Sequence, residues 1–163
     1  MRRLLFIVAG ALALYLGGRA LVHALASHET RVRWVIDDMV DGFNATRMNP
    51  ILDGLDRDFL DDTWGADRDT VRAAAAHLFF DAVDPQTKRF LYRAEWEPQS
   101  VVVSGDVSPV ATVAFEVRFF ELEGESESLA WKVRIEGDMH LDPERDWCFA
   151  RTRTTTLEGE KPR

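Results

Sequence analysis

The chain has 163 residues, of which 28 are acidic and 20 are basic, giving a formal net charge of −8. Because nucleic-acid binding needs clustered Lys and Arg side chains, an acidic chain with no basic cluster beyond its first residues is not expected to bind nucleic acid. Cys148 is the only cysteine, which excludes an internal disulfide and a cysteine-rich zinc site and predicts a buried thiol on a strand.

The first 26 residues have the pattern of a membrane-targeting segment. Arg2 and Arg3 precede an apolar stretch that continues to Ala26. Leu4 to Ala26, about 23 residues, is long enough to span a bilayer, and Arg19 lies past its centre, where its side chain can extend to the far interface. The alternative is a signal peptide cleaved after Ala26. We favour the uncleaved anchor, with a cytoplasmic N-terminus and an extracytoplasmic domain.

Helical periodicity dominates the next part of the chain. Between Glu29 and Ala45 the apolar residues fall on one face at 3.6 residues per turn. A short second helix is predicted from Pro50 to Leu60, since proline is tolerated at a first helical position. A third is predicted to begin at an N-cap aspartate, Asp67 or Asp69, and to end before Asp84-Pro85.

Apolar and polar residues then alternate with a period of two, which is typical of strands with one buried face. Turn residues divide this region, and a polar connection joins the two central strands as a hairpin. The predicted strands are Phe90–Val103, Val110–Leu122, Leu129–Met139 and Asp146–Leu157.

Three amphipathic helices followed by about four antiparallel strands can bury their apolar surfaces only against one another. We therefore predict an α+β domain over residues 27–157, in which the helices pack on the sheet. Residues 1–26 are the anchor or signal segment, and 158–163 form a loose tail.

This order of elements resembles the nuclear transport factor 2-like superfamily, whose cone-shaped fold is shared by ketosteroid isomerase and the polyketide-cyclase (SnoaL-like) group. The resemblance rests on the first helix, the Asp-rich helix from Pro50 to Phe59, and the pair Val110–Leu122 and Leu129–Met139 with its acidic hairpin tip. It implies a curved sheet and an apolar cavity between helices and concave face. The expected lining is Met39, Phe59, Trp64, Tyr92, Phe115 and Trp131. The alternative is that these side chains fill the core and leave no cavity.

Candidate catalytic groups are few. An isomerase of the ketosteroid type needs a carboxylate base with Tyr and acid donors. Tyr92 and His140 are the residues of their types least clearly assigned to solvent or membrane, and we predict that they do not converge. An acidic run comprises Asp53, Asp56, Asp58, Asp61 and Asp62. Most of these carboxylates are expected on an exposed helix, and their spacing does not match a calcium-binding loop. No metal or cofactor is therefore predicted.

Some side chains are expected away from the core. Trp34 and Phe80 lie opposite the apolar faces of their helices, and Trp34 follows the anchor closely enough to reach the membrane interface. The charged face of the sheet is either solvated surface with cross-strand ion pairs or a polar dimer or partner face; it comprises Glu116, Arg118, Lys132, Arg134 and Glu136.

The sequence favours a non-enzymatic, membrane-tethered interaction or ligand-binding domain, with a homodimer, an envelope protein or a small hydrophobic ligand as partner. Some exported domains of this fold belong to envelope assemblies, which the resemblance makes an expectation here. The alternative is a small exported isomerase, dehydratase or cyclase that acts on a hydrophobic substrate.

Overall fold

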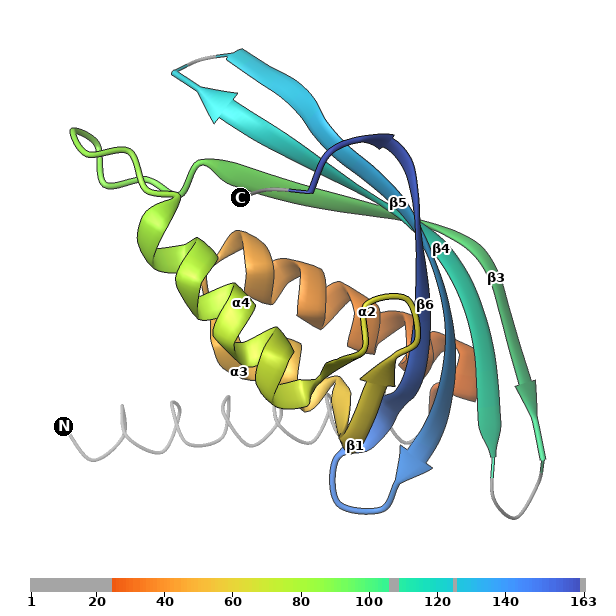
Figure 1. The fold of residues 1–163 in the computed structure, drawn as a ribbon. Coiled ribbons are helices and arrows are strands. Elements are labelled where there is room, and N and C mark those ends of the chain that lie inside the picture. The colour runs from red at the N-terminus through yellow and green to blue at the C-terminus, as the bar shows by residue number, and fades with distance from the viewer. Residues whose placement is uncertain (1–24, 106–108, 125, 162–163) are drawn as a thin grey trace, which may run out of the picture.

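A computed structural model describes residues 25–105, 109–124 and 126–161 and shows an α+β domain of two layers (Figure 1). One layer is a curved, open sheet of six strands in the order β2-β1-β6-β5-β4-β3, and the helices cover its concave face. The helices are α2 (His28–Asn44), α3 (Met48–Asp53) and α4 (Arg68–Asp81); the strands are β1 (Leu55–Asp61), β2 (Ala66–Asp67), β3 (Tyr92–Ser104), β4 (Val110–Glu123), β5 (Ser126–Asp142) and β6 (Asp146–Gly159).

None of the helices in this described part is long and apolar enough to span a membrane. The predicted anchor, Leu4 to Ala26, lies outside the described residues except for its last two positions.

Helix α2 confirms the first predicted helix. Ser27 caps it, because the Ser27 hydroxyl accepts a hydrogen bond from the Thr30 amide at 3.2 Å. Its apolar face buries Val32 and Ile36 against the sheet. At its last residue, the Asn44 side chain bonds to the main chain of β3, so the helix is fixed to the edge of the sheet.

The prediction of one helix from Pro50 to Leu60 is wrong. The helix ends at Asp53, where Gly54 is the C-cap, and Leu55–Asp61 forms β1. A Cβ atom at position 54 would lie 2.4 Å from the Sδ atom of Met39, so any larger residue there would have to displace the Met39 side chain of α2. In the segment that follows Gly54, the buried residues are Leu55, Phe59 and Asp61. This pattern fits a strand better than an exposed helix face.

Strand β1 also changes the sheet that we predicted. It runs parallel to β6, with Leu55 opposite Phe149, and β2 pairs antiparallel with it. The sheet is therefore mixed and has six strands, whereas the prediction was antiparallel with about four. The predicted curvature and the four long strands are confirmed, with ends shifted by a few residues.

Helix α4 confirms the third predicted helix, and Asp67 is its N-cap. The Asp67 carboxylate accepts hydrogen bonds from the Thr70 hydroxyl at 2.6 Å and the Thr70 amide at 2.7 Å, which lower its pKa. No residue of α4 is fully buried, and Phe80 is 83% exposed, as its position opposite the apolar stripe predicted.

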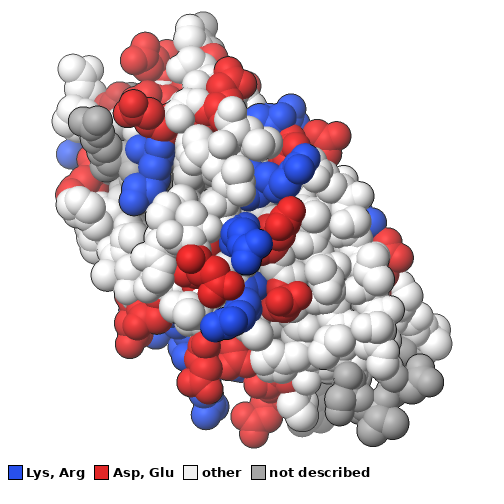
Figure 2. Space-filling view, turned by 45° about the vertical axis from the view of Figure 1, so that its right-hand side comes forward, with Lys and Arg blue, Asp and Glu red and all other residues white. Residues whose placement is uncertain are grey.

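The long strands confirm the predicted alternation. Side chains on the concave face form the core with α2, α3 and β1, including Val113, Phe115, Val117, Val133 and Phe149. On the convex face Glu116 pairs with Lys132 at 2.7 Å and with Arg134 at 3.5 Å. Basic and acidic side chains lie side by side over the surface shown in Figure 2. The convex face thus carries the cross-strand ion pairs that the alternation predicted.

Candidate ligand-binding groove

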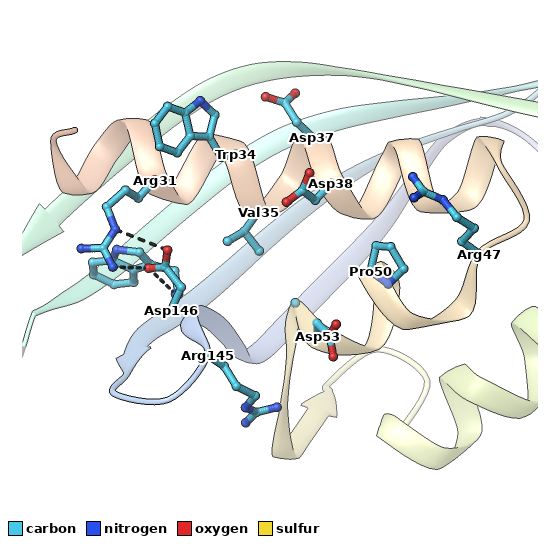
Figure 3. A pocket seen from close by; sticks show the side chains of 12 residues that line it. Arg31, Trp34, Val35, Asp37, Asp38, Arg47, Pro50, Asp53, Arg145 and Asp146 are labelled. Carbon is cyan, nitrogen blue, oxygen red and sulfur yellow. Dashed lines mark hydrogen bonds and ion pairs between the residues drawn. The ribbon is translucent and has the colours of Figure 1, made fainter. Parts of the chain in front are cut away.

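A groove of about 620 Å³ lies where α2 and α3 meet the turn between β5 and β6 (Figure 3). Helix α2 contributes Arg31, Trp34 and Asp38 to its lining. Asp53 comes from the end of α3, and Arg145 from the turn. The groove therefore brings together side chains from three segments that are distant in the sequence.

One wall of the groove is fixed by an ion pair between Arg31 of α2 and Asp146 at the start of β6. Arg31 Nη2 lies 2.5 Å and Nε 3.4 Å from the two carboxylate oxygens, and only about a fifth of each side chain is exposed (20% and 18%). The same carboxylate accepts a hydrogen bond from the Trp147 amide at 2.9 Å. Two-pronged charge-assisted bonds of this kind fix geometry as well as energy, so the pair holds α2 against the turn.

The indole of Trp147 lies beside this ion pair and carries an unusual polar atom. The residue is 1% exposed, and its ring packs edge-on against His28 with centroids 5.5 Å apart. Its Nε1 donor is buried and has no hydrogen-bond partner among the described residues, although Trp147 belongs to the groove lining. Leaving a buried donor unpaired costs about 1–3 kcal/mol. An acceptor atom that reaches the buried indole nitrogen removes that cost.

A second hollow of about 360 Å³ adjoins the first and shares Arg31, Arg145 and Asp146 with it. Its turn is rigid because the Asp142 carboxylate accepts hydrogen bonds from the amides of Glu144 and Arg145, at 2.7 and 3.1 Å. These bonds lower the pKa of Asp142. Arg145 also donates to the main-chain oxygen of Leu55 at 3.2 Å, which ties the turn to β1.

The six residues predicted to line a cavity lie elsewhere. Phe59, Phe115 and Trp131 are buried in the core, and Met39 packs against it. Neither of the two hollows is lined by any of the six.

Three of the six are nevertheless joined by a row of ring contacts. Trp64, which is 51% exposed, lies 5.8 Å from Trp131, and Trp131 stacks on Phe119 at 5.3 Å. Phe119 contacts Phe43, which leads through Phe90 to Tyr92, each with centroids within 6.0 Å. The residues that complete this row, Phe43, Phe90 and Phe119, were not predicted to line a cavity, because their apolar periodicity marks them only as core residues.

Tyr92 and His140 lie far apart. Tyr92 is opposite Glu121 at one end of β4, and His140 is opposite Val110 at the other end. At about 3.3 Å per residue the two positions are separated by roughly 35 Å along the strand. Burial, with a smaller contribution from Glu121, raises the pKa of Tyr92. General acid–base catalysis at one substrate needs both groups within about 3 Å of it, which this separation does not allow.

His140 has different neighbours, which were not predicted because Asp56 was expected on a helix. His140 Nε2 lies 2.7 Å from the Asp56 carboxylate, and Cys148 is its cross-strand partner. The three residue types match a cysteine–histidine–aspartate site, but the thiol is fully buried and its contacts are to the main-chain oxygens of Asp53 and Asp146. Burial raises the pKa of Cys148, whereas a nucleophilic cysteine needs a lowered one. Cys148 is therefore the buried strand thiol that was predicted.

Asp61 is a buried carboxylate, whereas most of the acidic run was expected to be exposed. It is 4% exposed and accepts hydrogen bonds from the hydroxyls of Thr152 and Thr154 at 2.8 and 3.1 Å. Its other oxygen accepts from the amides of Thr63 and Trp64 at 3.0 and 2.9 Å. The two threonine bonds hold the end of β1 to β6, and the two amide bonds close the β1–β2 turn, so Asp61 has a structural role.

Comparisons with known proteins identify the fold. No family model matches the sequence, and no curated protein matches it. A domain of unknown function with a cystatin-like fold from Nostoc punctiforme has a TM-score of 0.60 at 16% identity, over 80% of this chain and 77% of that chain.

A nuclear transport factor 2-like protein with a cystatin-like fold from Novosphingobium aromaticivorans gives a TM-score of 0.58 at 12% identity, over 89% of this chain and 90% of that chain. A ketosteroid isomerase-like protein from Erwinia carotovora atroseptica gives a TM-score of 0.56 at 11% identity, over 82% of this chain and 99% of that chain. At such low identity the likeness concerns the fold and not the activity. The chain therefore has the nuclear transport factor 2-like fold that its order of elements resembled.

Proposed function

We propose that this chain is a non-enzymatic, membrane-tethered binding domain, and that its ligand occupies the groove between α2, α3 and the β5–β6 turn. The observations that carry the proposal are the groove itself and the unpaired Nε1 donor of Trp147, a buried residue that contributes to the groove lining. Buried polar groups in proteins nearly always have partners, so this donor calls for an acceptor, either an ordered water or an atom of a ligand that reaches the indole. The lining carries both signs of charge, so the groove offers donors and acceptors to a polar ligand; the charged residues are Arg31, Arg47, Arg145, Asp37, Asp38, Asp53 and Asp146.

The position of the groove supports tethering as part of the function. Arg31 and Trp34 lie in the first turns of α2, which begins at His28, directly after the predicted anchor. An uncleaved anchor ending at Ala26 would hold the groove close to the bilayer surface. Its ligand would then be a molecule of the membrane surface or a segment of an envelope protein.

The anchor has a direct test. We expect the full chain to remain in the membrane fraction after extraction with alkaline carbonate, because the apolar segment Leu4–Ala26 is long enough to span the bilayer. Fractionation followed by immunoblotting measures this, and mass spectrometry of the N-terminus shows whether the segment is retained. Recovery of a soluble chain that begins at Ser27 would contradict the tethering.

The groove is tested by Trp147→Phe, which removes the donor and keeps an aromatic ring. We expect the full chain, purified from native membranes in mild detergent, to carry a bound species in native mass spectrometry. Losing one hydrogen bond of about 1.4 kcal/mol should reduce its occupancy by a factor of about ten under limiting ligand.

The matched control for this experiment is Lys132→Ala on the convex face, which should leave the occupancy unchanged. Near-ultraviolet circular dichroism of both variants shows whether the fold is kept. Equal occupancy in Trp147→Phe and wild-type protein, with the fold kept, would contradict the assignment of the ligand to this groove.

A further inference from the structure

Strand β3 is the last strand of the sheet, and half of its outer edge is protected. The Asn44 side chain accepts from the Ala94 amide at 2.7 Å and donates to the Ala94 oxygen at 2.9 Å, which replaces the bonds of a neighbouring strand. Pro98, further along, has no amide hydrogen to offer. Such devices prevent an edge strand from pairing with other chains.

The second half of this edge lacks these devices. The register shifts between Pro98 and Ser100, so that Gln99 is an extra residue on β3. Because Ala94 directs its amide and carbonyl outward, the alternation of the ladder places those of Val101 and Val103 outward as well. Among the described residues, no main-chain or side-chain hydrogen bond reaches them from outside the sheet.

The open half is also self-complementary. Its sequence, Ser100-Val101-Val102-Val103-Ser104, reads the same in both directions. In an antiparallel pair of two copies centred on Val102, Val101 faces Val103 of the second copy, and each such pair exchanges both N–H···O bonds. Val102, which is 62% exposed, meets its own equivalent across the two-fold axis.

We propose that this edge of β3 is a homodimer interface, at which two copies of the chain form one continuous sheet. Electrostatic repulsion does not prevent two copies from pairing at this edge. The chain has a net charge of −8, but residues 98–105 include no charged side chain. β-Branched residues suit a paired strand, and exposed Val102 gains most from burial. This proposal does not depend on the groove.

The size of the interface predicts its strength. A five-residue strand pair buries less than the roughly 1,200–2,000 Å² of stable protein–protein interfaces, so the dimer should be reversible. The two-fold axis of an antiparallel pair is perpendicular to the sheet, and both copies present their helices to the same side. Two chains anchored in one bilayer can therefore pair, and confinement there raises their effective concentration.

The test is a cysteine at the axis. In Val102→Cys the two equivalent residues form a non-hydrogen-bonded pair with Cα atoms about 4.5 Å apart, within the range of disulfides. We expect mild oxidation of the full chain in detergent micelles to give a disulfide-linked species of twice the chain mass. The only native cysteine, Cys148, is buried and should not contribute.

Two controls make the result specific. Val110→Cys, which is 49% exposed on β4 but away from the axis, should cross-link at least about fivefold less. The second control adds Val101→Pro to the Val102→Cys variant. Proline removes an outward-facing amide but leaves the hydrogen bonds between β3 and β4 in place, so cross-linking should also fall about fivefold. Three results would overturn the proposal. They are equal cross-linking of Val102→Cys and Val110→Cys, an unchanged cross-linking yield when Val101→Pro is added and the protein stays folded, and a disulfide adduct with a different protein.

Discussion

Replacing Trp131 with alanine is expected to lower the free energy of unfolding by about 3–5 kcal/mol, the cost of large-to-small changes in a core. Trp131 is 7% exposed and stacks on Phe119. Its indole also donates to the Thr156 hydroxyl at 3.2 Å, which joins β5 to β6. Truncation leaves a cavity in the row of rings and removes that bond. Urea titration followed by circular dichroism measures the change.

Lys132→Ala is the control, because its side chain lies on the convex face. Lys132 pairs with Glu116 at 2.7 Å, and partly exposed ion pairs contribute little, so we expect a change of about 0.5 kcal/mol. Similar losses from the two substitutions would mean that Trp131 is not a core residue and that the faces of β5 are assigned wrongly.

These two neighbours illustrate which parts of the fold can be predicted from the sequence. Alternation of apolar and charged residues fixes which face of β5 is buried, because a slip by one residue would exchange the faces. Helical spacing and an N-cap serine identify α2 in the same way. The resemblance to the nuclear transport factor 2-like fold followed from the order of such elements.

The local sequence pattern predicted the wrong element at β1. A helix was predicted from Pro50 to Leu60 because proline is tolerated at a first helical position and the apolar residues that follow can face inward. The strand exists because it pairs with β6 through Leu55 and Phe149. Gly54 gave a local signal for the break, but the partner strand is nearly a hundred residues away in the chain. Tertiary pairing of this kind overrides local propensity.

The sequence contains even less information about the groove than about β1. Arg31 and Asp146 are 115 residues apart, and nothing in either neighbourhood indicates the other. Trp147 has the parity of a buried strand residue, and only the structure shows that its Nε1 lacks a partner. Trp34 was identified as lying off the apolar face, but its place in the groove was not predicted.

Asp61→Ala should destabilise the domain by about 3 kcal/mol, because it leaves the buried hydroxyl of Thr154 and the amides of Thr63 and Trp64 without their acceptor. Hydrogen bonds to a carboxylate are worth more than neutral ones, and this carboxylate holds the β1–β2 turn on β6. Asp61→Asn should recover part of the loss, since its amide oxygen still accepts and threonine hydroxyls can accept from its NH₂ group.

The neighbouring Asp62 provides the comparison. It is exposed, and its carboxylate lies 3.8 Å from Arg151, so Asp62→Ala should change the free energy of unfolding by no more than about 0.5 kcal/mol. Thermal or urea unfolding of the three variants measures the order Asp61→Ala, Asp61→Asn, Asp62→Ala, from most to least destabilised. If Asp61 were exposed like Asp62, as most of this acidic run was expected to be, the two alanine variants would be equally stable; a difference of about 2 kcal/mol or more between them therefore shows that Asp61 is buried in solution.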